Sequence, residues 1–530
     1  MDIQKNKASS EGLDHLTVQK AENRAGPDDL LVIGIGASAG GLKALEAFFS
    51  HLPETPGMAF VVIVHLSPEH ESQMAALLQQ HTAMPVVQVN GPVHVEAGHV
   101  YVIPPGKDLT ITDSHLHLSK RSQNRHAPIN LFFRTLAETH GQHAVAVVLS
   151  GTGSDGAVGL GRVKERGGLT MAQSPDEAEY DAMPRSAVAT GHVDVILPVA
   201  ELAQALQGYG QSVGHSRLAE RPESLTTKDA GALTKIFAHL RARTGHDFTL
   251  YKHATILRRL TRRLHLSGTD DLAAYLAYLR ANADEVHNLL KDLLLTVTNF
   301  FRDPEAFAAL EKKVVPKLFK EKASGEAVRA WVCGCATGEE AYSIAMLLCE
   351  EAERQPHPTT PQVFASDISE GALRVAREGL YPEAIASDVP TERVSRFFDQ
   401  EPGGYRIKHE VREKIVFAAH NLLQDPPFSR LDLITCRNVL IYLDRSVHGR
   451  IFELFHYALR PGGYLFLGNA ESIDTPDLFR AVDKKHGLYQ RRPGAPIIRP
   501  SLSLSSAVSS SDPVASPATA RAEKHLDLVS

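Results

Sequence analysis

The N-terminal half of the chain is built around residues 31–41, L-V-I-G-I-G-A-S-A-G-G. The apolar run at the start of this stretch predicts a buried β-strand, and the apolar periodicity of residues 42–49 predicts a helix directly after it. Between them lies a G-x-S-x-G pattern, in which a serine sits on a tight strand-to-helix turn with its hydroxyl exposed. Free N–H groups at the N-terminus of the helix suit a developing oxyanion. The pattern therefore predicts Ser38 as a candidate nucleophile.

Two other interpretations of the same residues stay open. Gly34, Gly36 and Ala39 also fit the dinucleotide fingerprint G-x-G-x-x-G/A, which requires an acidic residue at the end of the next strand. The next predicted strand ends instead in His65, which counts against a nucleotide. The glycines also fit a tight turn that has no chemical role.

The composition of the 530-residue chain narrows the function classes. Hydrophobic and charged contents of 43% and 22% are typical of soluble globular proteins, and a net charge of −6 gives no reason to expect nonspecific nucleic-acid binding. The four cysteines (Cys333, Cys335, Cys349 and Cys436) are too few for a disulfide framework and lack the spacing of a zinc site. We therefore expect no metal site and a reducing, cytoplasmic setting. No apolar run is long enough to span a bilayer, so we expect no membrane insertion.

Alternating strand and helix patterns cover residues 29–208 and 301–493. They predict an α/β fold class with two doubly wound domains, each a mostly parallel sheet with helices on both faces. The purely helical pattern of residues 229–300 predicts a small all-helical subdomain before the second domain, and residues 381–413 predict a small inserted β-hairpin subdomain within it. The strands expected in the first domain are residues 30–35, 59–65, 85–89, 99–103, 144–149 and 192–197.

Three segments lack any periodicity. Residues 209–228 are expected to form a linker between the first domain and the helical subdomain. Residues 1–28 are polar, and residues 494–530 are rich in Ser, Ala and Pro, so both ends are expected to be disordered.

Three polar side chains follow predicted strands of the first domain. Ser38 follows the first strand, His65 ends the second, and Asp155 comes after the strand at residues 144–149. The carboxyl ends of parallel strands meet in one crevice, where a hydroxyl, an imidazole and a carboxylate can form a catalytic triad in any chain order. Taken singly, His65 also fits a polar strand cap, and Asp155 fits a helix N-cap. Together they predict a serine hydrolase with His65 as the base and Asp155 as its orienting carboxylate.

Longer motifs in this region carry a resemblance to a known family. The motifs are I-G-A-S-A-G-G at 35–41, V-H-L at 64–66, V-I-P-P-G-K-D-L at 102–109, L-S-G-T-G-S-D-G-A at 149–157 and A-M-P-R-S-A at 182–187. Residues 31–207 resemble the catalytic domain of the CheB-type chemotaxis protein-glutamate methylesterases. The resemblance implies that Ser38, His65 and Asp155 are the triad, that the domain removes methyl groups from glutamyl esters of chemoreceptors, and that it deamidates receptor glutamines.

One residue departs from that family. The family commonly has Thr after the nucleophile, where this chain has Ala39. We therefore expect the oxyanion donors to be backbone N–H groups of Gly40-Gly41 and of the loop at residues 151–154.

The second α/β domain begins with a glycine-bearing loop, residues 331–340, between a predicted strand and a predicted helix. The following strand ends at Asp367, where a carboxylate suits the two ribose hydroxyls of a nucleoside. The chain has no G-x-x-x-x-G-K-S/T phosphate loop, so a nucleoside without a triphosphate is favoured. These residues alone favour S-adenosylmethionine over NAD only weakly, and a glycine turn with a capping Asp stays an alternative.

A second resemblance covers residues 232–492. It rests on motifs that include T-V-T-N-F-F-R-D at 296–303, C-A-T-G-E-E-A-Y-S at 335–343, F-A-S-D-I at 364–368, C-R-N-V-L-I-Y at 436–442 and P-G-G-Y-L-F-L-G-N-A-E-S at 461–472. These residues resemble the CheR-type chemotaxis receptor protein-glutamate O-methyltransferases. The resemblance implies S-adenosylmethionine as the cofactor, with contacts at Thr298, Arg302, Glu340, Asp367, Asn421, Leu422, Asn438 and Val439.

Arginines are the candidates for binding the methyl acceptor. Arg302 is predicted to orient an ionised glutamate carboxylate through its planar fork, and an ordinary surface ion pair is the alternative. Arg258, Arg259, Arg262 and Arg263 recur at helical spacing and predict a basic face that binds an acidic receptor helix. RNA binding is disfavoured because the chain is net acidic and no aromatic platform accompanies the arginines. A merely solvated face stays open.

These predictions describe one chain with two opposed activities, a glutamyl methylesterase followed by a glutamate methyltransferase that uses S-adenosylmethionine. The expected partners are cytoplasmic helices of methyl-accepting chemoreceptors or similar signalling proteins. One alternative is a signalling scaffold whose esterase-like domain no longer turns over. Another is a methyltransferase for a different protein carboxylate.

Overall fold

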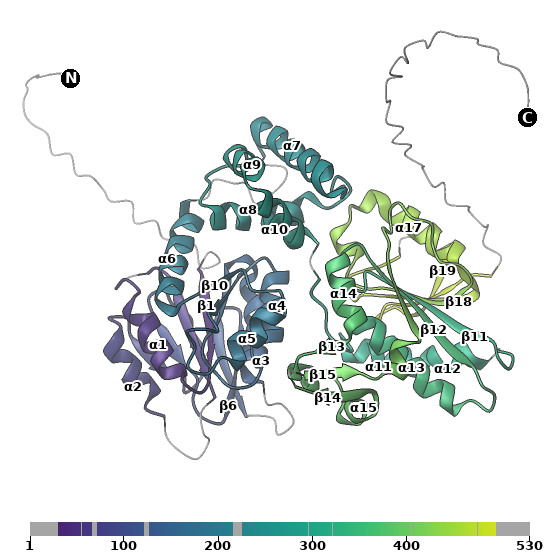
Figure 1. Ribbon diagram of the computed structural model, residues 1–530, viewed down its shortest axis with the longest axis horizontal. Helices are drawn as coiled ribbons and strands as arrows, with labels where there is room; N and C mark the ends of the chain where they lie inside the picture. The colour runs from purple at the N-terminus through teal and green to yellow at the C-terminus, as the bar shows by residue number, and fades with distance from the viewer. Residues whose placement is uncertain are drawn as a thin grey trace, which may run out of the picture.

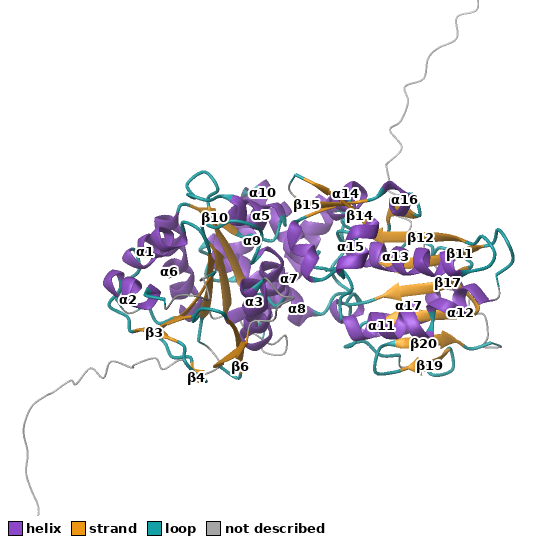
Figure 2. Cartoon of the chain, turned by 90° about the horizontal axis from the view of Figure 1, so that it is seen from below, coloured by secondary structure: helices purple, strands orange, loops and turns teal. Residues whose placement is uncertain are grey.

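The computed structural model describes residues 30–54, 56–65, 72–120, 127–215, 225–294, 296–320, 322–402, 404–473 and 475–493. The ends that were expected to be disordered, 1–28 and 494–530, lie outside these residues. Figures 1 and 2 show an N-terminal and a C-terminal α/β domain, and the group of helices that connects them lies at the top of Figure 1.

The N-terminal domain contains a seven-stranded sheet in which each strand runs parallel to its neighbours. Its strand order is β10 (Val195–Leu197), β9 (Leu169–Gln173), β8 (Ala144–Val148), β1 (Val32–Ala37), β2 (Ala59–Val64), β5 (Val100–Val102) and β3 (Val86–Gln88). One face is covered by α1 (Gly41–Ser50), α2 (Met74–Leu78) and α6 (Val199–His215), and the other by α3 (Pro128–His140), α4 (Ala157–Glu165) and α5 (Ala182–Ala189).

The all-apolar strand β2 explains why both faces need helices. Its Phe60 and Val62 pack in the core under α1 and α6, while Val61 and Ile63 pack in the core under α3. Successive side chains of a strand point to opposite faces, so such a strand is stable only when both faces are covered. A small antiparallel sheet, β4 (Val93–His94), β7 (His115–Lys120) and β6 (Lys107–Thr112), adds to the α3 side.

Four strands of this domain were not predicted: β9 and the three strands of the small antiparallel sheet, β4, β6 and β7. β9 contains Thr170 and Gln173, which interrupt the apolar run that indicates a buried strand. Both are satisfied inside the fold, because Thr170 Oγ1 donates to the His192 carbonyl at 2.6 Å and Gln173 accepts from the Ser150 N–H at 2.8 Å. The β6–β7 hairpin turns at Asp113-Ser114 with positive φ angles of 47° and 58°, where Asn-Gly is the usual signal.

The linker prediction is wrong for residues 209–215. They extend α6, and Tyr209 packs in the core of the N-terminal domain. The next helix begins at Thr227, after a cap in which the Thr226 hydroxyl accepts from the Asp229 N–H at 3.1 Å. The segment between, from residue 216 to 224, lies outside the described residues.

The all-helical subdomain has its own core. It consists of α7 (Thr227–Thr244), α8 (His253–Ser267), α9 (Leu272–Ala281) and α10 (Ala283–Leu293), whose apolar faces bury Tyr275 and a set of leucines. Two further helices, α11 (Pro304–Lys313) and α12 (Val315–Lys320), pack instead in the core of the C-terminal domain.

The C-terminal domain holds a second seven-stranded sheet, parallel except at one edge where β20 pairs antiparallel with β18 and β19. Its order is β16 (Ile415–Ala419), β12 (Thr360–Asp367), β11 (Ala327–Cys333), β17 (Leu431–Cys436), β18 (Leu459–Leu467), β20 (Leu488–Arg491) and β19 (Phe479–Asp483). The helices α13 (Glu339–Arg354), α14 (Glu370–Glu378) and α17 (Arg445–Ala458) pack against it.

The inserted subdomain is present between α14 and β16. The pair β14 (Phe398–Glu401) and β15 (Gly404–Ile407) forms the expected hairpin, and β13 (Leu380–Tyr381) adds a third strand. The helices α15 (Thr391–Phe397) and α16 (His409–Arg412) complete it. In both α/β domains the first strand, β1 or β11, lies between two other strands of its sheet. The loops at the carboxyl ends of such neighbouring strands form a ligand crevice.

Candidate active sites

The first site lies at the carboxyl ends of the adjacent strands β1, β2 and β8. The Ser38 Oγ lies 3.4 Å from His65 Nδ1, and His65 Nε2 lies 2.9 Å from Asp155 Oδ2. Since a carboxylate only accepts, His65 Nε2–H donates to Asp155, and Nδ1 is left to accept the Ser38 proton. The Asp155 side chain is 6% exposed and that of His65 is 26% exposed, so the triad is buried at its carboxylate, while Ser38 is half-buried.

Two helix N-termini hold the Asp155 carboxylate. It accepts hydrogen bonds from the backbone N–H groups of Ile129 and Asn130 in the first turn of α3, at 3.0 and 2.9 Å. It also accepts from the N–H of Gly156, the residue before α4, at 2.9 Å. These donors fix the carboxylate and, through it, the orientation of the imidazole. Sequence reasoning missed Ile129 and Asn130, because a backbone donor leaves no mark in the residue type.

The elbow around Ser38 depends on two glycines. A Cβ on Gly36 would lie 2.4 Å from Ile129 Cγ2, so a side chain there would displace α3. Gly40 has a φ of 69°, and a Cβ on it would lie 2.8 Å from Ser150 Oγ. The sharp turn that exposes the Ser38 hydroxyl therefore needs glycine on both sides.

The backbone around Ser38 corrects the expected oxyanion donors. The N–H of Gly41 donates to the Ser38 carbonyl at 2.9 Å, and the N–H of Gly151 donates to the Tyr180 carbonyl at 2.9 Å, so both are engaged. Within the described part of the chain, no hydrogen bond involves the N–H groups of Ala39 and Gly40. The N–H of the residue after the nucleophile is a common oxyanion donor in elbows of this kind.

The second site is a cavity at the carboxyl ends of β11, β12 and β17. All the positions predicted to contact S-adenosylmethionine line it, although they come from widely separated segments: Thr298, Arg302, Glu340, Asp367, Asn421, Leu422, Asn438 and Val439. The structure thus brings together every predicted contact, and their binding to the cofactor stays a prediction.

Three features of the cavity fit a nucleoside ligand. A Cβ on Gly334, which has a φ of 65°, would lie 2.5 Å from Val439 Cγ2, so only glycine leaves the loop open here. Asn438 Oδ1 is buried and has no hydrogen-bond partner among the described residues. The Asp367 carboxylate is fixed by the N–H groups of Ala336 and Ser369, both at 2.8 Å, and burial raises the pKa of Asp367. A donor from the ligand would satisfy both Asn438 and Asp367.

Two charged side chains of the cavity, Glu340 and Arg302, are already paired. Glu340 accepts from Thr435 Oγ1 at 2.7 Å and lies 3.4 Å from Arg437 Nη1, whose side chain is fully buried. Arg302 donates through Nη2 to Glu165 of the N-terminal domain at 2.8 Å and through Nη1 to the Val297 carbonyl at 3.3 Å. The predicted acceptor-binding arginine is therefore held by a carboxylate from the other domain.

The expected basic face of α8 is wrong for three of its four arginines. Arg262 is 3% exposed and pairs with Asp194 at 3.0 Å and with Asp292 at 2.6 Å. Arg263 pairs with Glu285, and Arg259 is buried with its Nη1 donating to the Leu293 carbonyl at 2.6 Å. Arg258 alone of the four is exposed. Helical spacing places arginines on a face but does not show which elements cover that face.

Two further residues of the second site were not predicted to function. Tyr251 and Tyr442 line the cavity, and burial raises the pKa of both to about 12. The Tyr442 hydroxyl also lies 3.4 Å from Glu165 Oε1. The signal for Tyr442 was its place at the end of the motif C-R-N-V-L-I-Y, whereas nothing in the sequence around Glu165 pointed to this cavity.

Three family models match the chain in order. They are CheB methylesterase at residues 33–206, the all-alpha domain of CheR methyltransferase at 231–294, and the SAM binding domain of CheR methyltransferase at 296–488. A chemotaxis protein methyltransferase of Pseudomonas aeruginosa is 31% identical over 247 residues, 45% of this chain and 90% of that protein. The chain belongs to the chemotaxis protein methyltransferase family. Its first domain is a CheB methylesterase domain, and the cofactor of its last domain is S-adenosylmethionine.

Other relatives cover more or less of the chain. An uncharacterized 104.1 kDa protein of Rhodobacter capsulatus is 41% identical over 448 residues, 80% of this chain and 47% of that protein, so the chain spans about half the length of this relative. The solved CheB methylesterase catalytic domain of Thermotoga maritima is 26% identical and covers 34% of this chain and 97% of its own, with a TM-score of 0.31. Within the described residues, every helix is too short or too polar for a transmembrane span.

Proposed function

We propose that this chain both adds and removes methyl esters on glutamate side chains of chemoreceptors. The observation that carries the proposal is that one chain holds a Ser-His-Asp triad and a cavity lined by every predicted S-adenosylmethionine contact. Membership in the methyltransferase family and the additional CheB methylesterase domain support the same pair of reactions.

In the hydrolysis, His65 takes the proton of Ser38 while the serine oxygen attacks the ester carbonyl. Asp155 stabilises the imidazolium that forms, and the N–H groups of Ala39 and Gly40 are the proposed oxyanion donors. His65 then returns the proton to the leaving oxygen, and methanol departs. A water molecule attacks the acyl-serine with His65 again as the base, which releases the glutamate carboxylate. The same steps on a receptor glutamine would release ammonia.

In the methylation, S-adenosylmethionine supplies the methyl group, and the chain binds this cofactor and orients the acceptor carboxylate. Asp367 is proposed to hold the ribose hydroxyls, and Arg302 to orient the acceptor carboxylate. A glutamate carboxylate, with a reference pKa of about 4.3, is ionised at neutral pH, so the reaction needs no general base. Placement of the two reactants is the main contribution of these residues.

The acceptor is proposed to be a cytoplasmic helix of a methyl-accepting chemoreceptor, which implies a cytoplasmic setting for the chain. Arg258 remains the candidate for a contact with such an acidic helix, because its side chain is exposed. The other arginines of α8 are engaged by groups within the chain: Arg262 by Asp194, Arg263 by Glu285 and Arg259 by the Leu293 carbonyl.

The experiment uses methyl-labelled S-adenosylmethionine, the purified chain and a cytoplasmic chemoreceptor fragment with glutamates at its methylation positions. We expect label on the receptor fragment that is released by mild base, as a methyl ester is. Label on a different protein of a bacterial lysate, with none on the receptor fragment, would reject chemoreceptors as the substrate.

A further inference from the structure

Helix α4 connects the two active sites. Its N-terminus follows Gly156, the residue next to Asp155 of the esterase triad, and its last residue is Glu165. A helix of nine residues is about 13 Å long. Because α4 runs from the carboxyl end of β8 back toward the start of β9, Glu165 lies near the amino ends of the strands. There its Oε1 accepts from Arg302 Nη2 at 2.8 Å and lies 3.4 Å from the Tyr442 hydroxyl. Arg302 and Tyr442 both line the cofactor cavity.

The group that Glu165 places on Arg302 is a glutamate carboxylate, the same group that the proposed methyl transfer acts on. Burial alone would raise the pKa of Glu165, but the charges of Arg302 and Arg162 outweigh it and hold the pKa below its usual range. The ionised carboxylate is 9% exposed, and Arg302 is 11% exposed. Helix stability does not account for this residue, because the dipole at a helix C-terminus disfavours a negative charge.

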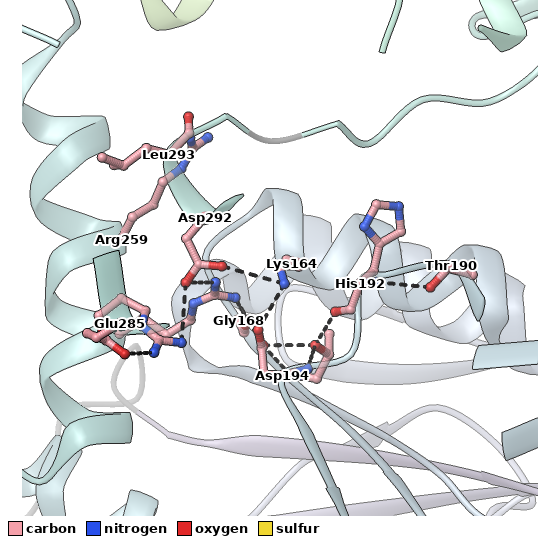
Figure 3. Close-up of polar contacts among 12 residues, drawn as sticks. Lys164, Gly168, Thr190, His192, Asp194, Arg259, Glu285, Asp292 and Leu293 are labelled. Atoms are coloured by element: carbon pink, nitrogen blue, oxygen red, sulfur yellow. Dashed lines mark hydrogen bonds and ion pairs between the residues drawn. The ribbon is translucent and has the colours of Figure 1, made fainter. Parts of the chain in front are cut away.

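The neighbours of Glu165 fix its position. The preceding residue, Lys164, pairs with Asp194 at 3.0 Å and with Asp292 of α10 at 3.5 Å, and Figure 3 shows it between these two carboxylates. Arg262 of α8 binds the same two carboxylates, so two cations and two anions form a closed buried cluster across the domain boundary.

Arg162 adds a second link to the methyltransferase side. It binds Glu165 Oε2 at 2.8 Å and lies 3.4 Å from Asn299 Oδ1. The contacts of Lys164 and Arg162 thus fix the end of α4 against the methyltransferase. The carboxylate of Glu165 can bind Arg302 without a further loss of conformational entropy.

We propose that Glu165 occupies the place of the acceptor carboxylate on Arg302, so that the esterase domain inhibits methyl transfer in cis until an acceptor displaces Glu165. This inference rests on the proposed function, since it identifies the subsite of the methyl acceptor. An acceptor glutamate and Glu165 cannot use the same face of one guanidinium, so each acceptor must first displace Glu165. The apparent affinity for the acceptor is then lower than its intrinsic affinity by the fraction of molecules in which Arg302 is free.

The test compares Glu165→Gln with Asp388→Asn. The first removes the charge that competes for Arg302 and keeps the size of the side chain. The second likewise removes the negative charge from another contact between the domains, Arg134 with Asp388 at 2.9 Å, and neither of these residues lines the cavity. Four quantities are measured. They are the KM for the chemoreceptor fragment, the Kd of the labelled fragment for the chain loaded with S-adenosylhomocysteine (by fluorescence anisotropy), the Kd of S-adenosylhomocysteine (by calorimetry), and the rate of methanol release.

We expect Glu165→Gln to lower the KM and the fragment Kd by about tenfold and to leave methanol release unchanged. The Kd of S-adenosylhomocysteine should change less than the fragment Kd, although Arg302 is also a predicted cofactor contact. Asp388→Asn should leave all of them unchanged. An unchanged fragment Kd in Glu165→Gln, equal changes in both variants, or a change in S-adenosylhomocysteine binding alone would overturn the proposal. If no variant methylates the fragment, the proposed function fails, and the anisotropy measurement still decides whether Glu165 competes with the acceptor.

Discussion

The esterase site and the methyltransferase site differ in what their reactive side chains contact. In the first, Ser38, His65 and Asp155 contact one another, and the nucleophile Ser38 is half-buried. In the second, Glu340 is paired with Arg437, and Arg302 is paired with Glu165 from the other domain. The reactive side chains of the esterase site are paired with one another, whereas an arginine of the methyltransferase site is paired with a carboxylate of the other domain.

This difference follows from the chemistry of the two reactions. Ester hydrolysis needs a nucleophile and a base, which the chain must carry and hold in contact before the substrate arrives. Methyl transfer to a carboxylate needs only the orientation of the two reactants. The groups that bind the acceptor can therefore bind another carboxylate of the chain while no acceptor is present. The predictions below ask whether the two sites are as independent and as different as this comparison implies.

The largest effect is expected from Ser38→Ala. Without its nucleophile the esterase should lose at least about 10⁴-fold in turnover, while methyl incorporation into the chemoreceptor fragment should stay unchanged. Methanol release and label incorporation are measured on the same preparation. A loss of both activities at an unchanged melting temperature would contradict the independence of the sites.

A smaller loss is expected from Asp367→Ala in the methyltransferase site. If Asp367 binds the ribose, the change removes hydrogen bonds to a charged group and weakens cofactor binding by about 2 kcal/mol, or about 30-fold. Calorimetry with S-adenosylhomocysteine measures this, and methanol release serves as the control because the triad lies in the other domain. Unchanged affinity would rule out the ribose role of Asp367.

A gain in esterase turnover is expected from Ala39→Thr. A hydroxyl next to the proposed backbone donors adds one hydrogen bond to the oxyanion, which should raise kcat about tenfold with little change in KM. Ala39→Val is the matched control, since valine has the shape of threonine without the hydroxyl. If both variants behave alike, the oxyanion of this esterase does not lack a side-chain donor.

The smallest effect concerns the pH dependence of the folding stability, through His192. Burial and the charge of Lys164 lower the pKa of His192 from 6.5 to about 4, so the unfolded chain binds a proton more readily than the folded chain. Stability is therefore full above pH 6.5 and falls as the pH drops toward 4, by about 1 kcal/mol between pH 7.5 and 6. Melting temperatures should show this loss in the parent and a smaller loss in His192→Gln. Equal losses in both would show that protonation of His192 does not contribute to the pH dependence of stability.

The sequence predicted the fold where the pattern of residues is local. The apolar strand before Ser38 and the glycines around it indicate strand, turn and helix without reference to the rest of the chain. The β6–β7 hairpin was missed because its turn is Asp113-Ser114 and lacks the usual Asn-Gly signal. β9 was missed because its determinants are not local. Thr170 and Gln173 are compatible with a buried strand only through partners such as His192 and Ser150, which lie elsewhere in the sequence.

The candidate sites follow the same rule. Motifs located the triad and the cofactor cavity, because the carboxyl ends of parallel strands place such residues together. The role of the arginines in α8 depended on Asp194 and Asp292, which come from other elements, so the expected basic face was wrong. The contact of Glu165 with Arg302 joins residues that are 137 positions apart, and no spacing rule covers such a pair.

The most direct test of the central claim, that one chain adds and removes the same methyl group, is a chase of labelled receptor. The chemoreceptor fragment is first methylated with label by the Ser38→Ala variant, purified, and then given to the parent chain. The account predicts that the parent releases the label as methanol and that the Ser38→Ala variant releases none. Label that stays on the receptor in both samples would contradict the account and would make the first domain a module without esterase activity.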